Sequence, residues 1–197
     1  MSLLNDPPFS LGQTLGVSST DDGKFWAGAV KEFPDTDPTT GKLRSGRRKV
    51  CVAVRNTSAA ALLPKRVVRF AVGTAGPGLF SNVDGYAAET NEERVGVVDE
   101  WLPASGVAVN DIFWVTVQGP TEIAHALSGS PVAVGDRLAC VTAATSGATT
   151  AGRVGPSSLT SSTTGAANNN GLGVIARACS TGATTGSNVL ALVFTKS

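Results

Sequence analysis

The chain has 197 residues, 42% of them hydrophobic, and a formal net charge of only +1 at pH 7. This length can bury the core of one domain, and the near-neutral charge argues against a dedicated nucleic-acid binder, which is usually strongly basic. Residues 1–8 lack a basic region followed by an apolar core, and no window reaches the roughly 18 uninterrupted apolar residues of a membrane helix, so we expect neither a secretory signal nor a membrane span.

The composition favours β-structure over a helix bundle. Val and Ala supply most of the apolar content, Met occurs once, and 23 Gly and 10 Pro residues add many turns. The three cysteines, Cys51, Cys140 and Cys179, are odd in number and widely spaced, which fits neither a disulfide framework nor a zinc site with CxxC pairs. We expect all three to be buried free thiols.

Residues 1–20 combine Pro7-Pro8 with isolated apolar side chains and show neither helical nor strand periodicity. This pattern predicts an extended N-terminal arm, followed by a β-domain over residues 21–197. The apolar anchors that would dock this arm on a neighbouring subunit are Leu3, Leu4, Phe9 and Leu11.

Strand and turn patterns alternate through the first half of the domain. Residues 24–30 form the first strand candidate, and the turn-rich loop 35–41 leads into a basic strand over 47–55. Another strand is predicted over 66–72. The connection 56–64 has room for one helical turn, which its Pro would end.

A pattern that occurs twice follows in the second half. Residues 95–98, a turn-rich stretch and the apolar run 112–117 are echoed by residues 172–175, a turn and residues 188–194. Each copy predicts a short strand, a reversal and a longer strand, because β-branched and aromatic residues fill the strand positions. Residues 131–141 hold a third variant, whose Gly-Asp pair supplies turn chemistry.

Two segments are predicted to lack extended strands. Residues 73–85 form a loop rich in Gly, with one Pro, and residues 142–171 consist almost wholly of Ser, Thr, Ala, Gly and Asn. The second segment carries too little apolar surface to fold unaided. We therefore expect a long surface excursion that Val154 and Leu159 attach locally.

Charges are segregated along the chain. Nine cations and no acid lie between residues 42 and 69, whereas acids dominate from residue 84 to residue 136. We interpret this asymmetry as serving contacts between subunits, since complementary patches steer association. Nucleic acid and a merely solvated loop are the alternatives for the basic block, which has no interleaved aromatic residues. The residues predicted to contact an acidic protein surface are Arg44, Arg47, Arg48 and Lys49.

Reactive chemistry is sparse. His125 is the only histidine, and no GxSxG, HExxH or P-loop pattern occurs. Glu122 and His125 fall on opposite faces of a predicted strand, and Asp35 and Asp37 are out of register with a calcium-binding loop. We expect a non-enzymatic protein without metal or cofactor, in which His125 is a dispensable surface or hydrogen-bonded residue.

The three tryptophans leave a second kind of binding open. Trp114 lies inside an apolar run and is predicted to be core, whereas Trp101 beside a Leu-Pro pair is placed at a rim or subunit boundary. If Trp26, Trp101 and Trp114 were exposed together, their rings would offer a surface on which a sugar could stack. A glycan-binding β-module therefore stays an alternative.

The order of these elements resembles that of the small β-barrel decoration, or cement, proteins of tailed-phage capsids. The resemblance covers residues 95–117, 132–138 and 173–194, roughly the second half of the chain. It implies a protein on the outside of the capsid lattice, often a trimer, that reinforces junctions between major capsid subunits. The basic block and the long arm depart from the shortest members of the family.

The sequence thus predicts an all-β domain, a hairpin-built barrel or sandwich with an extended N-terminal arm and a long Ser/Thr/Gly-rich loop. We expect a virion structural protein, made in the host cytoplasm, that binds the major capsid protein and associates with itself as a homotrimer. No membrane or nucleic-acid partner is expected. Another phage structural component, such as a head fibre base or a tail protein, is the alternative.

Overall fold

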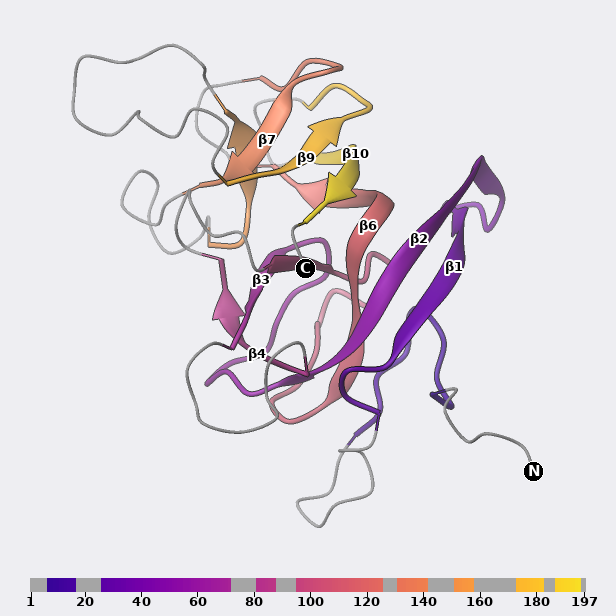
Figure 1. The fold of residues 1–197 in the computed structure, drawn as a ribbon, viewed down its shortest axis with the longest axis vertical. Helices are drawn as coiled ribbons and strands as arrows, with labels where there is room; N and C mark the ends of the chain where they lie inside the picture. The colour runs from indigo at the N-terminus through magenta and orange to yellow at the C-terminus, as the bar shows by residue number, and fades with distance from the viewer. Residues whose placement is uncertain are drawn as a thin grey trace, which may run out of the picture.

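The computed structural model describes residues 7–16, 26–71, 81–87, 95–125, 131–141, 151–157, 173–182 and 187–195 (Figure 1). Within these ranges the chain forms ten β-strands and no helix, which confirms the all-β prediction. No helix long and apolar enough to cross a membrane lies in this described part. The strands are β1 (Val30–Thr36), β2 (Leu43–Asn56), β3 (Val67–Phe70), β4 (Asn82–Tyr86), β5 (Val95–Val98), β6 (Ile112–Ala124), β7 (Arg137–Cys140), β8 (Val154–Pro156), β9 (Val174–Ala178) and β10 (Asn188–Phe194).

Five strands pair in a cycle and form a small barrel-like sheet, called the barrel below. The pairings run from β2 to β4, β3, β5 and β6, and β6 pairs back with β2. Alternation along the strands sends every second side chain inward. The interior is therefore filled by β-branched and aromatic residues, among them Val54, Phe70, Val83, Phe113 and Val115.

A second sheet continues from the other half of β6. It runs from β6 to β10, β9, β7 and β8, and a parallel bridge between His125 and Val154 brings its two ends together. Its core includes Ile123, Leu138 and Ile175, together with the outward-facing side chains of β3 and β5. Strand β5, whose sequence is Val-Gly-Val-Val, is consequently buried on both faces.

Strand β6 serves both sheets and changes sheet at Gly119. Its first residues pair with β2, and residues 118–124 pair with β10. The β2–β6 register shifts by a bulge between Val50 and Cys51, close to Gly119. Gly119 has a φ of +103°, and a Cβ there would lie 2.6 Å from the carbonyl oxygen of Arg48. Only glycine fits this crossing of two backbones.

The N-terminal segment and β1 cover the outside of the barrel. The Phe9 ring stacks on the Trp114 indole at 5.0 Å between centroids, and Trp114 Nε1 donates to the Phe9 carbonyl oxygen at 3.2 Å. Phe33 of β1 meets the same indole edge-on at 5.2 Å. Leu15 and Ile112 exchange two backbone hydrogen bonds of 2.8 and 2.9 Å. Residues 7–16 therefore pack on this chain's own sheet, while Leu3 and Leu4 lie outside the described residues.

The two repeated strand pairs are present as predicted. β5 pairs with β6, and β10 with β9, each antiparallel. The third variant differs, because Val132 forms a bridge with Gly182 and β7 lies between β8 and β9. β8 falls inside residues 142–171, which were predicted to form a surface excursion. Its Val154 is fully buried, in agreement with the prediction that this side chain attaches the segment to the domain. Leu159 lies outside the described residues.

Other expectations from the sequence are wrong. Residues 26–28 form a turn and not a strand, and β1 begins only at Val30 and continues through Pro34. β4 lies partly in the predicted loop 73–85, and residues 56–64 show no helical turn. Cys51 and Cys140 are buried free thiols, but Cys179 is exposed.

His125 is not the surface residue that was one of its two predicted settings, because it is only 1% exposed. It follows the last residue of β6, where its bridge with Val154 closes the second sheet. That His125 is dispensable stays a prediction.

We predict that Gly119→Ala lowers the free energy of unfolding by about 2 kcal/mol or more, because the new methyl group meets backbone at a positive φ. Urea denaturation measures the change. Gly46→Ala is the matched control, since a Cβ at Gly46 meets nothing within 4 Å. Equal midpoints for Gly119→Ala and the wild type would contradict this account of the crossing.

Candidate functional site

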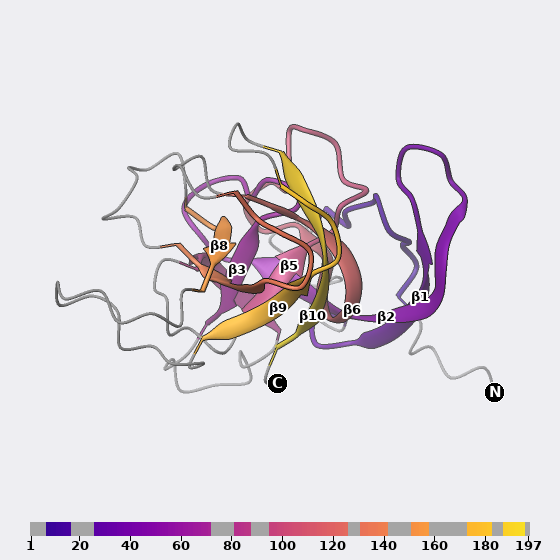
Figure 2. The same ribbon diagram turned by 90° about the horizontal axis from the view of Figure 1, so that it is seen from above.

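A two-stranded ribbon projects from the body of the molecule. It consists of β1 and residues 43–49 of β2, which pair with β1 alone, whereas from Val50 onward β2 also pairs with β6. Figure 1 and Figure 2 both show this ribbon extending beyond the strands of the two sheets. Asp37 closes its turn by accepting the backbone N–H groups of Thr39 and Thr40 at 2.7 and 3.1 Å, and these bonds lower the Asp37 pKa.

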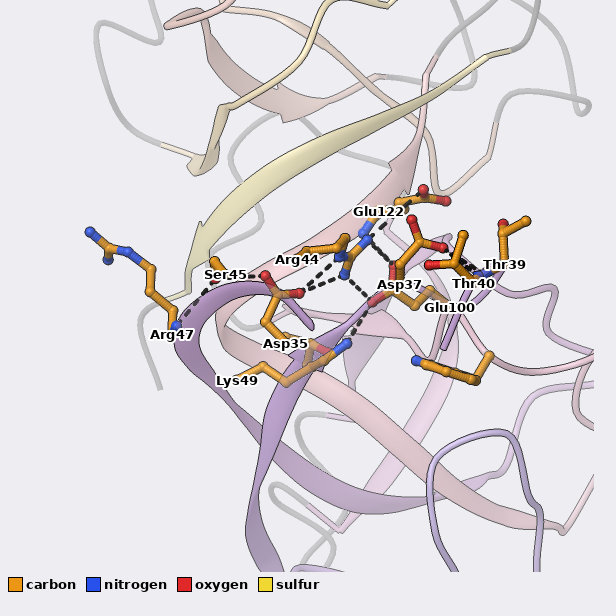
Figure 3. A network of polar contacts seen from close by, with 12 residues as sticks. Asp35, Asp37, Thr39, Thr40, Arg44, Ser45, Arg47, Lys49, Glu100 and Glu122 are labelled. Atoms are coloured by element: carbon orange, nitrogen blue, oxygen red, sulfur yellow. Dashed lines mark hydrogen bonds and ion pairs between the residues drawn. The ribbon is translucent and has the colours of Figure 1, made fainter. Parts of the chain in front are cut away.

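A buried cluster of charges fastens the ribbon to the body (Figure 3). Arg44 donates from Nη1 and Nη2 to the two carboxylate oxygens of Glu100, at 3.0 and 2.6 Å. Its Nε donates to Asp35 Oδ1 at 2.9 Å. One guanidinium thus joins both ribbon strands to the turn after β5, with the bidentate geometry that makes such pairs strong.

Lys49 and Glu122 extend this charge cluster. Lys49 Nζ lies 2.5 Å from Glu100 Oε1, and both side chains are buried. The backbone N–H of Glu122 donates to Glu100 Oε2 at 3.1 Å, and the Glu122 carboxylate pairs with Lys65 Nζ at 2.7 Å. Ribbon, turn and β6 are therefore held in one arrangement through a single carboxylate.

The Arg44 guanidinium stays charged in this setting. Burial alone would lower its pKa, but the hydrogen bonds and negative charges of Glu100 and Asp35 raise the pKa above its ordinary value. A charge that cannot be neutralised by proton loss must be matched by its partners. The cluster consequently acts as a fixed structural clamp.

The carboxylate next to Glu100 holds the N-terminal segment instead. Asp99 Oδ2 accepts the Gly12 N–H at 2.5 Å, and Oδ1 accepts the Trp101 N–H at 3.1 Å. Asp99 is 2% exposed, and burial raises its pKa to about 6, although these hydrogen bonds and Lys49 act in the opposite direction. The Asp99-Glu100 dipeptide thus anchors two separate elements on the barrel.

The segregated charges meet within one chain. Four cations of the basic block pair with acids of the following acidic stretch: Arg44 and Lys49 with Glu100, Lys65 with Glu122, and Arg69 with Asp84. The interpretation that the whole asymmetry serves contacts between subunits therefore needs correction. Folding brings the two blocks together, so four of the nine cations are paired within one chain.

The predicted partner-binding residues fall into two groups. The side chains of Lys49 and Arg44 are only 1% and 11% exposed and face the cluster, so they are not available to a partner. Arg47 is exposed, and Arg48 is 74% exposed beside Glu32. Phe9 and Leu11 are anchors, but on the outside of this chain's own barrel. Trp101 is partly exposed, and its predicted place at a subunit boundary stays a prediction.

No sequence pattern indicated the roles of Asp35, Asp99 and Glu100. Asp99 and Glu100 are adjacent in the chain, yet they bind different partners. An available signal was the apolar context of both acids, between Val98 and Trp101-Leu102. Acids in such a context are rarely buried unless they are paired.

The described residues offer little reactive chemistry. No group of three or more His, Cys, Asp or Glu side chains within this part of the chain is placed to hold a metal ion. Burial raises the pKa of the Cys51 thiol to about 12, so this buried cysteine is not an activated nucleophile. Trp114 is fully buried and cannot stack on a sugar.

Comparison with known proteins adds one distant likeness. No protein-family model and no curated protein matches the chain. Among solved structures, the N base of the head fiber gp8.5 in bacteriophage phi29 is similar over 73% of this chain and 92% of its own, with 17% sequence identity and a TM-score of 0.41. A likeness this loose does not transfer function from one chain to the other.

We predict that Glu100→Gln lowers the free energy of unfolding by about 3–5 kcal/mol, because it leaves buried Lys49 without its opposing charge. Chemical denaturation measures the loss. In the control Glu32→Gln, an exposed pair with Arg48 is removed, and a change within about 1 kcal/mol is expected. Similar losses in both variants would mean that the buried cluster is no clamp.

Asp99 should make the protein more stable as the pH falls from about 6 toward 4. Its folded pKa of about 6 exceeds its ordinary value of 3.8, so the folded state binds the proton more tightly. The contribution, on the order of 1–3 kcal/mol, is fully present below the unfolded pKa and is lost as the pH rises through the folded pKa. Urea titrations across this range measure it.

The control is Asp99→Asn, which cannot titrate. In this variant the free energy of unfolding should lack the rise that the wild type shows as the pH falls from about 6 to 3.8. An unchanged pH dependence in Asp99→Asn would assign the effect to other carboxyl groups.

Proposed function

We propose that this protein is a non-enzymatic virion structural protein, a decoration or cement protein on the outer surface of a phage head. In this role it would bind the major capsid protein, as a homotrimer, and stabilise junctions between capsid subunits. The resemblance of the sequence to capsid decoration proteins supports this proposal, and the observation that carries it is the projecting ribbon.

The ribbon has the properties of a docking element. Its exposed residues include apolar and cationic groups: Val30 and Leu43 are 65% and 68% exposed, and Arg47 and Arg48 are also exposed. The buried cluster of Arg44, Asp35, Lys49 and Glu100 fixes the ribbon before any partner arrives. A preorganised element loses little conformational entropy on binding, so more of its contact energy appears as affinity.

The charge on the ribbon favours an acidic protein surface. Arg47 and Lys42 have no ion-pair partner among the described residues, and Arg48 has only the exposed Glu32. Exposed cations of this kind mainly speed encounter and set orientation. A nucleic acid would also attract them, but three cations without a stacking aromatic make a poor binding site for it.

The alternative of a glycan-binding module has lost support. The sugar-stacking surface required exposed tryptophans, but Trp114 is in the core and Trp26 packs against Phe9 and its neighbours on the barrel. Another phage structural component, such as a head fibre base or a tail protein, could use the same ribbon. Binding to empty heads separates this alternative from decoration of the capsid lattice.

We predict that the double variant Arg47→Glu, Arg48→Glu binds empty capsids at least about tenfold more weakly than the wild type and with a flatter salt dependence. Cosedimentation at several ionic strengths measures both effects. Arg137→Glu is the control, because Arg137 is an exposed strand arginine of β7, far from the ribbon in sequence.

Stabilisation is tested separately from binding. Capsids that carry the wild-type protein should disrupt at a higher temperature than bare capsids, because the ligand binds only the intact lattice. Binding without any rise in this temperature would favour a fibre base over a cement protein. Absence of binding to heads, with retention on tails, would overturn the capsid role.

A further inference from the structure

Two arginines lie directly opposite each other on the outer face of the second sheet. Arg137 of β7 and Arg177 of β9 are register partners in the antiparallel pairing of these strands. Both are exposed, whereas the next pair in the register, Leu138 and Ala176, is fully buried. Directly opposite residues of an antiparallel pair send their side chains to the same face and close together. Two guanidinium groups therefore share one small area of surface.

Within the described residues, no acid pairs with either of these arginines. The Arg137 side chain makes no hydrogen bond or ion pair there, and Arg177 donates only from Nε, to the Gly135 carbonyl oxygen at 3.1 Å. Asp136 accepts the backbone N–H of Ala133 at 2.8 Å instead, and no acid follows it in the sequence. Like charges directly opposite each other destabilise a sheet. The arginine pair consequently does not serve the fold itself.

The bond to Gly135 orients Arg177 for a ligand. It holds the guanidinium beside the turn that leads into Arg137, while Nη1 and Nη2 donate to no described residue. The turn is fixed in its place, because Gly135 N donates to the Ala178 carbonyl oxygen and Ala178 N to that of Asp136, both at 2.9 Å. Guanidinium groups with free Nη donors match the two oxygens of a carboxylate.

Apolar side chains continue the same face on the next strand. Leu192 of β10 is the register partner of Arg177, and Leu190 and Phe194 lie on the same face two residues to either side of Leu192. Leu190 and Leu192 are partly exposed, and Phe194 is 44% exposed. The face therefore combines two cations with an apolar strip.

We propose that this face binds an acidic segment of another protein, with carboxylates on Arg137 and Arg177 and apolar side chains on Leu192 and Phe194. Two adjacent guanidinium groups relieve their mutual repulsion when they share a negative ligand. A nucleic acid is a poorer match, because a chain of phosphates needs a row of cations, and the described part of this face places two together. The apolar strip beside them favours a protein segment.

This face is separate from the ribbon, and the inference does not depend on the proposed capsid role. Figure 1 and Figure 2 both show β6 and β10 between β9 and the ribbon, in agreement with the strand order. A protein docked through its ribbon would therefore still present the arginine pair. One chain could hold two different proteins at once.

The test is binding of a fluorescein-labelled peptide, Glu-Glu-Leu-Glu-Glu, to the full-length chain, measured by anisotropy at low ionic strength. Every protein carries Arg47→Glu and Arg48→Glu, so that the ribbon does not attract the peptide, and this double variant is the parent. Adding Arg137→Gln should weaken binding at least about tenfold. The matched control, Arg69→Gln, removes one charge from an exposed pair with Asp84 and should bind within about twofold of the parent. Equal losses in both variants would overturn the proposal.

Two further measurements separate a defined surface from general attraction between charges and from misfolding. Phe194→Ala should weaken binding of the leucine peptide about threefold and leave binding of an all-glutamate peptide unchanged. Arg137→Gln should unfold at a temperature no lower than that of the parent, because it relieves like-charge repulsion. A lower unfolding temperature, or equal effects of Phe194→Ala on both peptides, would overturn the proposal.

Single-stranded DNA is the competing ligand. If DNA binds the parent more tightly than the peptide does and Arg137→Gln abolishes that binding, the face is a nucleic-acid site and the proposal is wrong. Cosedimentation of Arg137→Glu with empty capsids tests the ribbon alone. Failure at the arginine pair is therefore distinguishable from failure of the capsid role.

Discussion

Strand β6 has to serve two sheets with one backbone, and this constraint organises the whole molecule. Its first half supplies Phe113 and Val115 to the barrel, and its second half supplies Ile123 to the other core. A straight strand cannot face two cores in this way without changing direction. The bulge in the β2–β6 pairing and the positive φ of Gly119 provide that change within a few residues. β2, β5 and β10 pair directly with β6, and the remaining strands join the structure through these three.

The same crossing explains why charge is buried close by. At Gly119 the backbones of β2 and β6 approach closely, which brings Lys49 and Glu122 to the edge of the barrel. Glu100 lies between them and neutralises a lysine and an arginine at once. Such clusters need not add net stability over an apolar core of the same shape. The hydrogen bonds in such a cluster require particular distances and angles, however, and here they hold the ribbon in one orientation.

Much of the fold was predictable because alternation is a local signal. The strand pairs β5–β6 and β9–β10 were found from β-branched residues bounded by turns. β4, with the sequence Asn-Val-Asp-Gly-Tyr, has weak β-propensity and is a strand only because β2 and β3 flank it. β1 was misplaced because its later half holds Pro34 and Asp35, which are tolerated on an edge strand.

The site was harder to predict because its partners are distant in sequence. Arg44 and Glu100 are 56 residues apart, so no spacing rule links them. The opposite charges of the two blocks were visible, but whether they meet within one chain or between chains is decided by the fold. Exposure is likewise a tertiary property, which is why Arg47 and Lys49, two residues apart, have opposite roles.

The contact between Phe9 and Trp114 has a consequence for the order of folding. Its partners are 105 residues apart, so the beginning of the chain leaves the ribosome long before its binding surface exists. The Trp114 surface forms only when β2 and β6 have paired, and the N-terminal segment can close over it only afterwards. Such non-local closure is slow compared with hairpin formation. Residues 7–16 are therefore synthesised before the surface that they cover and are among the last to reach their place.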